Sequence, residues 1–466
     1  MNKGKTVDID IGKKAQKGNG VEQDENGYHY TSSNGGTVNL TDDWFPEPEG
    51  TYRKFTHTPK GGKIGSINSG NQGLNTFTGL ATYNSVSVFY WSDDNTFRNP
   101  LLIQLGSEND DYYTDPEGDN TWSKQSGVHN GTLRKTLDKE NCKRNYAHVL
   151  DISKKNNTNY NCPSCDTGTK INVSYSSVAS IISSAYTIPG ARSPFSVTSF
   201  KNDNNWQAGL PSLKDVKNVK VIWSSYVGNN KPLLSVTPQT GNKRYFRRNA
   251  ENGNAWIEVT ASQSSLPNGE TPTLATLDLS RHAGTYTNGD VKITVRVSHI
   301  GDGYYRYQYS LCGGPFRATK VQNNSSTLSG IEYLDGTLDS ISAYYFGSTT
   351  EPPNLLLVEL RSQGGKNYNY FCRETKDAHT WSPCLGSGGE TGKQLVGSSL
   401  KQTLDAIRKV QFPDPPKSIG QQILDFLNST SGKITEGVTG GLATVGLGGL
   451  GIWKGPALIA KLIARL

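Results

Sequence analysis

The sequence predicts an all-β protein with three tandem antiparallel β-sandwich (Ig-like) modules, followed by a short helical, glycine-rich C-terminal tail. Three observations predict this class: a composition typical of strands, a motif that occurs three times, and apolar residues that alternate along the chain. The 466 residues include 51 glycines and 23 tyrosines but one methionine, and only 33% belong to the hydrophobic types. Such a composition is typical of short strands and turns rather than of helical bundles.

The repeated motif consists of an apolar strand, a second strand with a leucine pair, an aromatic pair and a tryptophan. Its three copies read VSVFYW from Val86 with PLLIQL from Pro100 and Trp122; VKVIW from Val219 with PLLSV from Pro232 and Trp256; and ISAYYF from Ile341 with LLLVEL from Leu355 and Trp381. A second landmark opens each copy: DIGKK at Asp10, DISKK at Asp151 and DLSRH at Asp278. Two landmarks with nearly the same period indicate tandem repeats. We therefore predict β modules at 1–145, 146–273 and 274–411, and a linker and tail at 412–466.

Inside a module, apolar residues recur at every second position, as in Val291, Ile293, Val295 and Val297. A period of two predicts strands with one packed face and one wet face, and the intervening Gly/Asn clusters predict tight turns. Helical periodicity is nearly absent before residue 399. We expect only short helices, near 133–137, in the counterpart segment SSLKQTLDAIRKV at 398–410, and near the C-terminus.

The repeated tryptophans are predicted to be core residues rather than ligand-stacking rings, because large aromatic side chains dominate cores. If the three copies share one fold, Trp122, Trp256 and Trp381 occupy equivalent buried positions. Each is then expected to lie near its own leucine pair, at 101–102, 233–234 or 356–357.

The tail is the candidate membrane contact. After the proline-rich segment 412–418, residues 419–429 predict a short amphipathic helix or stalk, and residues 437–453 carry no charge. As a helix, that uncharged segment would span about 25 Å, less than the hydrocarbon core of roughly 30 Å. The last eleven residues predict a small basic amphipathic helix. Three interpretations stay open: a spanning or re-entrant anchor, an interfacial helix after a glycine loop, and a soluble disordered tail.

Cysteines offer a second pattern. Cys162 and Cys165 form a C-x-x-C pair, with Cys142 and His148 upstream. Three interpretations remain open: a zinc site with all four residues as ligands, a disulfide from Cys142 to Cys162 or Cys165, and free thiols. One C-x-x-C pair is a weak indication of zinc, so we predict no metal site. Further along the chain, candidates for a disulfide in an oxidising compartment are Cys372 and Cys384, which would leave Cys312 odd or paired with a distant thiol.

Charge excludes one class of function. Lysines and arginines number 48 and acids 41, so the net charge of +7 is spread over the whole chain. A dedicated nucleic-acid binder would concentrate its charge, so no nucleic-acid partner is expected. The segment KRYFRR places four cations beside two aromatic residues, either as a patch for an anionic ligand or as a charged edge strand. Those cations are Lys243, Arg244, Arg247 and Arg248.

No catalytic pattern is visible. The sequence lacks G-x-S-x-G, H-E-x-x-H and P-loop motifs, so we predict no catalytic residues and no cofactor. The match GLGGLG at 446–451 has no surrounding βαβ unit and is not a dinucleotide loop.

Several of these motifs together resemble a known family. VSVFYW followed by PLLIQL, the NC…AHVLDISKK…NCPSC segment at 141–165 and the terminal GLGIWKGPALIAKLIARL are similar to the lineage-expanded multigene proteins of Theileria-type piroplasm parasites. The resemblance covers Val7 to Leu466. It implies a parasite-specific repeat protein, a surface or secreted antigen that faces host cells, and it supplies no catalytic residues.

The leading hypothesis is a non-enzymatic, membrane-associated repeat protein, a parasite antigen or adhesion protein that binds a host or parasite protein or glycan through its module loops. One alternative is a carbohydrate-active or other hydrolase with a carboxylate pair on a β scaffold. Another is an intracellular scaffold anchored by its C-terminus. The first 20 residues contain no apolar run typical of a secretory signal, so both the cell surface or secretory pathway and the cytosolic face remain open.

Overall fold

The computed structural model describes residues 6–412, apart from the segments 107–110, 116, 167, 179–180, 191–193, 225–231, 249–252, 260–273, 289–290, 312–315, 332–336, 363–365, 379 and 385–391. Most of this part is β-strand, and its only α-helices are α1 (Asn130–Asn145) and α2 (Gly397–Gln411). The all-β class is therefore confirmed. Within the described part, no helix is long and apolar enough to cross a membrane. The predicted membrane tail from 413 onward and Cys312 lie outside that part.

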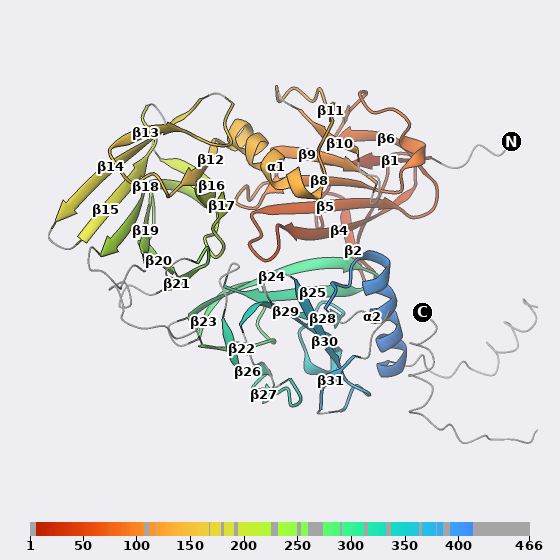
Figure 1. The fold of residues 1–466 in the computed structure, drawn as a ribbon. Coiled ribbons are helices and arrows are strands. Elements are labelled where there is room, and N and C mark those ends of the chain that lie inside the picture. Colours follow the sequence, from red (N-terminus) through yellow and green to blue (C-terminus); the bar gives the residue numbers. More distant parts are fainter. Residues whose placement is uncertain are drawn as a thin grey trace, which may run out of the picture.

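Three sets of strands follow one pairing pattern, and we call them the first, second and third repeat (Figure 1). The first comprises β1 (Thr6–Asp10), β2 (Val21–Asp24), β3 (Gly27–Thr31), β4 (Thr37–Phe45), β5 (Tyr52–Pro59), β6 (Lys63–Ser69), β7 (Gln72–Gly73), the 3-10 helix η1 (Leu80–Thr82), β8 (Val86–Trp91), β9 (Pro100–Leu105), β10 (Asp111–Thr114) and β11 (Ser123–Gln125), followed by α1. The second comprises β12 (Ala147–Asp151), β13 (Thr158–Asn161), β14 (Lys170–Val178), β15 (Ile181–Thr187), β16 (Phe195–Asn202), β17 (Asn205–Trp206), β18 (Leu213–Ser224), β19 (Leu233–Pro238), β20 (Arg244–Arg248) and β21 (Trp256–Val259). The third comprises β22 (Leu274–Asp278), β23 (Gly284–Asn288), β24 (Val291–Gly301), β25 (Tyr304–Ser310), β26 (Arg317–Asn323), β27 (Ser326–Thr327), β28 (Leu338–Phe346), the 3-10 helix η3 (Pro352–Asn354), β29 (Leu355–Ser362), β30 (Asn367–Cys372) and β31 (Ser382–Pro383), followed by α2.

One strand pair in each repeat departs from the predicted antiparallel arrangement. The first strand pairs in parallel with a strand that opens a small hairpin: β1 with β6, β12 with β16, and β22 with β26. The other strands form an antiparallel meander. Parallel neighbours need a long crossover connection, and the strands between the two partners supply it here.

The DIGKK-type landmark ends the first strand of every repeat. Its aspartate backbone N–H donates a hydrogen bond to a tyrosine hydroxyl each time, for Asp10 to Tyr30 (2.9 Å), Asp151 to Tyr160 (2.9 Å) and Asp278 to Tyr286 (3.1 Å). The aspartate side chain accepts a backbone N–H two residues further on, at distances of 2.8–3.1 Å. This motif therefore shapes a turn.

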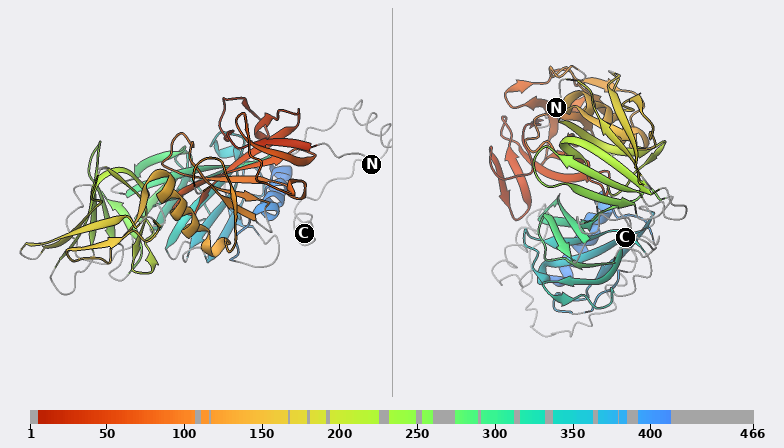
Figure 2. Two further views of the ribbon diagram at one scale, coloured as in Figure 1. Left: turned by 90° about the horizontal axis from the view of Figure 1, so that it is seen from above. Right: turned by 90° about the vertical axis from the view of Figure 1, so that its left-hand side faces the viewer.

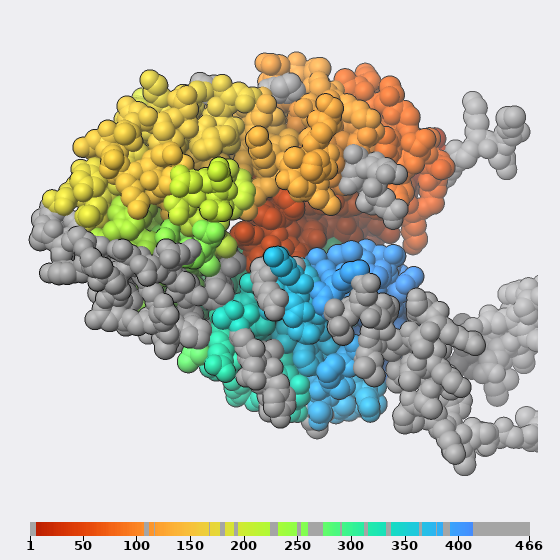
Figure 3. Space-filling model, in the orientation of Figure 1, coloured from red at the N-terminus to blue at the C-terminus, as the bar shows by residue number. Residues whose placement is uncertain are grey.

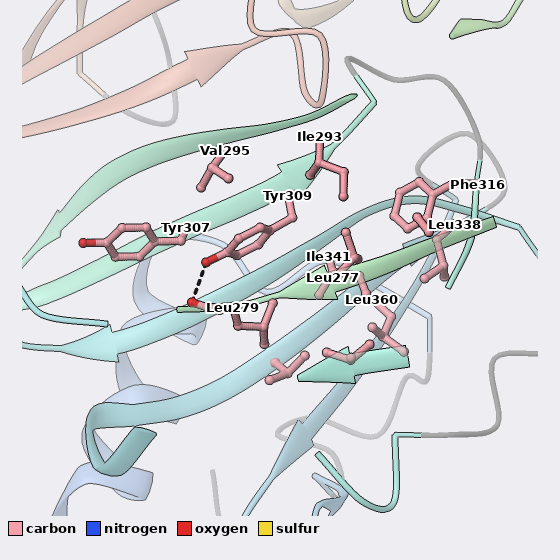
Figure 4. Packing of buried hydrophobic residues seen from close by; sticks show 14 of the residues in the cluster. Leu277, Leu279, Ile293, Val295, Tyr307, Tyr309, Phe316, Leu338, Ile341 and Leu360 are labelled. Carbon is pink, nitrogen blue, oxygen red and sulfur yellow. Dashed lines mark hydrogen bonds between the residues drawn. The ribbon is translucent and has the colours of Figure 1, made fainter. Parts of the chain in front are cut away.

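A core lies between the small and large sheets of the third repeat (Figure 4). Leu277 of β22 packs in one cluster with Ile293 and Ile341 of the large sheet, and the Tyr309 hydroxyl donates to the backbone carbonyl of Leu279 at 2.6 Å. Apolar residues from the second repeat extend this cluster; they are Leu233, Ile257 and Val259. The described part of the second repeat contains no helix, and the third repeat covers part of its surface.

The leucine pairs do not lie where the sequence predicted in the first and third repeats. Leu101–Leu102 cluster with Leu133 and Leu137 of α1, apart from the core that holds Trp122. Similarly, 356–357 cluster with the leucines of α2, apart from Trp381. Each helix covers a second face of its large sheet. For the same reason every residue of β8 is buried, although one wet face was expected.

The first and third repeats are joined into one sheet. β4 pairs with β24 through Asp42 and His299, which produces a sheet of 15 strands. In Figures 1 and 2 the second repeat lies at one end of the molecule, and α1 lies between it and the first repeat. The space-filling view in Figure 3 shows the first and second repeats on one side of the third. The three repeats therefore pack against one another as one body rather than as separate, loosely linked domains.

Candidate functional site

Three cysteines and one histidine converge at the C-terminal end of α1. Cys142, His148, Cys162 and Cys165 are all buried, and one sulfur or imidazole nitrogen atom from each lies within 4.8 Å of all the others. Nδ1 of His148 lies 3.1 Å from Sγ of Cys165 and 3.7 Å from Sγ of Cys142. Cys142 and Cys165 are in disulfide contact, and Cys162 is a free buried thiol. The structure thus brings together the four residues that the sequence singled out.

Three neighbouring segments carry these four side chains. Cys142 lies in the last turn of α1, which ends at Tyr146 in the left-handed conformation (φ 52°). That residue turns the chain directly into β12, which carries His148. Cys162 and Cys165 lie on the connection between β13 and β14, where the Cys165 N–H donates to the Cys162 carbonyl at 3.3 Å. A helix end, a strand and a hairpin loop therefore meet at one point.

Burial determines the charge state of the imidazole. His148 is 5% exposed, and burial lowers its pKa to about 4. The ring is therefore neutral at neutral pH and keeps a nitrogen lone pair. Neutral imidazole and cysteine sulfur are ligand types that Zn²⁺ prefers in proteins.

The second cysteine pair has simpler surroundings. Cys372 and Cys384, both predicted as disulfide candidates, are in disulfide contact across β30 and the residues after β31, with Cα atoms 5.5 Å apart. Among the described residues, the only His/Cys/Asp/Glu group suited to a metal ion is the one at Cys142, so this pair joins no such group.

The four cations of the KRYFRR segment do not form one continuous surface. β20 is a strand, so Arg244 and Arg248 project on one side and Arg247 on the other, and Lys243 precedes the strand. Arg244 forms a bidentate pair with Glu258, with both distances 2.9 Å. β20 pairs with both β19 and β21, so the expectation of a charged edge strand was wrong and this strand lies inside its sheet.

Buried acids occupy the junction between β4 and β24. Asp42 accepts hydrogen bonds from the Arg53 guanidinium and from His299, whose backbone N–H lies 2.9 Å away. Burial alone would raise the pKa of Asp42, but Arg53 and His299 outweigh it and lower that pKa. This carboxylate is thus a paired structural anion.

Two further acids lie close to the same junction. Burial raises the pKa of Glu47, although the Arg306 guanidinium, 2.5 Å away, opposes the shift. Glu359 is fully buried and accepts hydroxyl hydrogen bonds of 2.9–3.0 Å from Ser342, Tyr344 and Tyr370. Neither Glu47 nor Glu359 lines either of two pockets in the described part, one in the first repeat and one between the first and second repeats.

One of those pockets contains a residue that sequence reasoning missed. A hollow of about 300 Å³ in the first repeat is lined by Lys14, Tyr90 and Arg98, among others. The Lys14 ammonium donates to the Ile11 carbonyl at 2.7 Å and to the Tyr90 hydroxyl at 2.5 Å, and burial lowers its pKa to about 7. Its signal in the sequence was the second lysine of DIGKK, which we treated only as a landmark.

Comparisons of this chain with protein-family models, with curated proteins and with solved structures each found no match. Its function is therefore argued from the residues and their geometry.

Proposed function

We propose that this protein is a non-enzymatic, membrane-associated interaction protein. In this proposal three β-sandwich modules with Ig-like layering present binding loops, and the tail after residue 412 associates with a membrane. The ligand is a host or parasite protein or glycan, in keeping with the parasite antigen family that the sequence resembles. Rigid sandwiches commonly carry binding function in the loops between their strands.

The observation that carries this proposal is a constant framework with variable connections. All three repeats keep the same strand pairing and the same tyrosine bond to the landmark aspartate. The connections differ: residues 32–36 join β3 to β4, 162–169 join β13 to β14, and 289–290 join β23 to β24. A framework that stays fixed while its loops vary is typical of proteins that diversify their binding surfaces.

The arrangement of buried acids disfavours the hydrolase alternative. A glycoside hydrolase needs two carboxyl groups facing a substrate cleft. Glu47 and Glu359 are instead held by Arg306 and by a set of hydroxyl groups inside the junction. If the full chain hydrolysed a panel of glycosides or esters, and Glu359→Gln abolished that activity, the non-enzymatic proposal would be wrong.

Membrane association is tested with the full chain and with a chain that ends at residue 411. We expect the full chain to stay with the membranes after carbonate extraction and the shortened chain to be released. Release of both would remove the membrane part of the proposal. Protease treatment of intact cells then identifies the exposed face: cleavage of the modules indicates surface display, and protection indicates an intracellular scaffold.

A further inference from the structure

We propose that Cys142, His148, Cys162 and Cys165 bind one Zn²⁺ ion, and that this ion fastens α1 to the second repeat. The inference goes beyond the proposed interaction function. It depends on the convergence of four suitable ligands from three separate pieces of chain.

The distances from His148 to two of the sulfurs are close to those of a closed tetrahedral site. With Zn–S bonds of about 2.3 Å, ligand atoms of a tetrahedral centre lie roughly 3.8 Å apart. His148 Nδ1 lies 3.7 Å from Cys142 Sγ and 3.1 Å from Cys165 Sγ, and all four ligand atoms lie within 4.8 Å of one another. The sulfurs of Cys142 and Cys165 are in disulfide contact, so this bond must be reduced and the two sulfurs must separate before side-chain rotations can place one ion among the four ligands.

A disulfide alone accounts for only half of this group. The Cys142–Cys165 contact uses two of the four residues and leaves a third thiol, Cys162, 4% exposed beside a buried imidazole. The Cys372–Cys384 contact is an example of a disulfide without further metal-ligating side chains around it, because among the described residues it belongs to no larger ligand group. Four convergent ligands indicate a metal site in the reduced protein.

Comparison of the repeats gives a second, independent argument. The hairpin connection of the second repeat, 162–169, is longer than the corresponding connections 32–36 and 289–290, and only it contains cysteine. On the helices, alignment of the TLD segments places Lys409 of α2 opposite Cys142 of α1. The three cysteines therefore depart from the repeated pattern together, at a single place.

Binding starts from the reduced protein, in which a small-molecule thiol has opened the Cys142–Cys165 disulfide by supplying two electrons and two protons and has itself become a disulfide. Three thiols each release one proton and the neutral imidazole donates a lone pair, so Zn²⁺ gains three thiolate ligands and one nitrogen ligand. Four protein ligands leave no open position for water or substrate, which is typical of structural rather than catalytic zinc.

The ion would reinforce contacts that already cross from α1 to the second repeat. Lys139 lies 2.8 Å from Asp166, which directly follows Cys165 in the chain, and the Asn141 amide donates to the Thr198 hydroxyl at 2.8 Å. Loss of the ion should therefore loosen this junction before it affects the third repeat.

The test uses the full chain, purified under reducing conditions without chelator. We expect elemental analysis to find one zinc per chain, and Co²⁺ in its place to give the absorption of a tetrahedral thiolate site. Cys162→Ser and His148→Ala should each reduce the bound metal at least tenfold at equal free Zn²⁺. The matched control, Cys372→Ser with Cys384→Ser, should retain one zinc.

Because a ligand variant can fail to fold, a second measurement uses the unaltered chain. With zinc bound, Cys142, Cys162 and Cys165 should resist alkylation, and addition of a chelator should expose all three. The proposal is wrong if the reduced chain binds no zinc, or if zinc remains after Cys162→Ser. It is equally wrong if the chain from its native source carries the Cys142–Cys165 disulfide and no metal.

Discussion

The helices α1 and α2 cover equivalent strands of the first and third repeats, and they make the same contact with different consequences. The Tyr52 hydroxyl donates to Asp138 of α1 at 2.6 Å, and the Tyr304 hydroxyl donates to Asp405 of α2 at 2.7 Å. Both helices also begin with a side-chain cap, from Thr132 in α1 and Ser399 in α2.

The difference lies in what covers each aspartate. Asp138 is 1% exposed because the second repeat packs over it, whereas the Asp405 side chain is 36% exposed. Burial raises the pKa of Asp138 to about 6. For Asp405, the effect of partial burial is outweighed by the hydrogen bonds from Tyr304 and Lys401, and its pKa falls below the ordinary value. The local sequence therefore determines the contact, and the neighbouring repeat determines its protonation.

The largest effect is expected in the cores of the first and third repeats, where the comparison predicts equal losses of stability. Trp122→Ala and Trp381→Ala remove tryptophans that are each 3% exposed, so each should cost about 3–5 kcal/mol. Hydrogen exchange of β8 and of β28 would measure the loss in each repeat. A loss below about 1 kcal/mol at either site would contradict the equivalence of the two cores.

The next test removes apolar contacts beneath the helices. Leu137 of α1 and Leu404 of α2 are both fully buried, so Leu137→Ala and Leu404→Ala should each cost about 2–5 kcal/mol. Lys135→Ala and Gln402→Ala are matched controls, because both side chains are exposed two positions earlier on each helix. If the controls destabilise the helices as much as the leucine variants do, packing is not the cause.

The pH dependence of the two helices should have opposite sign. The folded pKa of Asp138, about 6, lies above its ordinary 3.8, so its folded state keeps a proton that the unfolded state releases. The free energy of unfolding of α1 should therefore fall by roughly 2 kcal/mol between pH 4 and 6. Asp405 has a lowered folded pKa, so its stabilising contribution is present above the ordinary carboxyl pKa and is lost as the solution is acidified.

Asparagine variants isolate these contributions. Asp138→Asn should abolish the fall in stability of α1, and Asp405→Asn should abolish the acid sensitivity of α2, as measured by hydrogen exchange of helix amides at several pH values. Identical slopes in both helices would contradict the assigned environments.

The smallest effect concerns the tyrosine–aspartate hydrogen bond that occurs at each helix. Tyr52→Phe should cost about 1–3 kcal/mol, because Asp138 Oδ2 already lacks a partner and the buried acid would lose its closest donor. Tyr304→Phe should cost about 1 kcal/mol or less, since Asp405 retains Lys401 at 3.1 Å and reaches water. Thermal unfolding of the two variants at pH 7 would rank them, and the reverse order would overturn this explanation.

Local patterns predicted the strand class and the positions of both described helices. Alternation of apolar residues revealed strands, and the leucines of TLRKTL and SLKQTL marked α1 and α2. The leucine pairs were misplaced because alternation does not distinguish two buried faces of one strand. The β4–β24 junction was not foreseen, since it depends on the pairing of Asp42 with His299, which no local pattern records.

The candidate metal centre shows the same limit. All four ligands were named from the sequence, yet their spacing left zinc, a disulfide and free thiols open. Only the turn at Tyr146 and the turn from Cys162 to Cys165 bring the four side chains together. The signal present in the sequence is that only the second copy carries cysteines in this stretch of the repeat.

The Asp42–His299 pair also has a consequence for protein synthesis. The two residues are separated by 257 positions, and a ribosome adds about 5–20 residues per second, so Asp42 waits roughly 13–50 s for its partner. During that interval the exposed end of β4 on the nascent chain is an unpaired edge, which is prone to wrong associations. The first repeat to leave the ribosome therefore acquires its final neighbour only when the last repeat emerges.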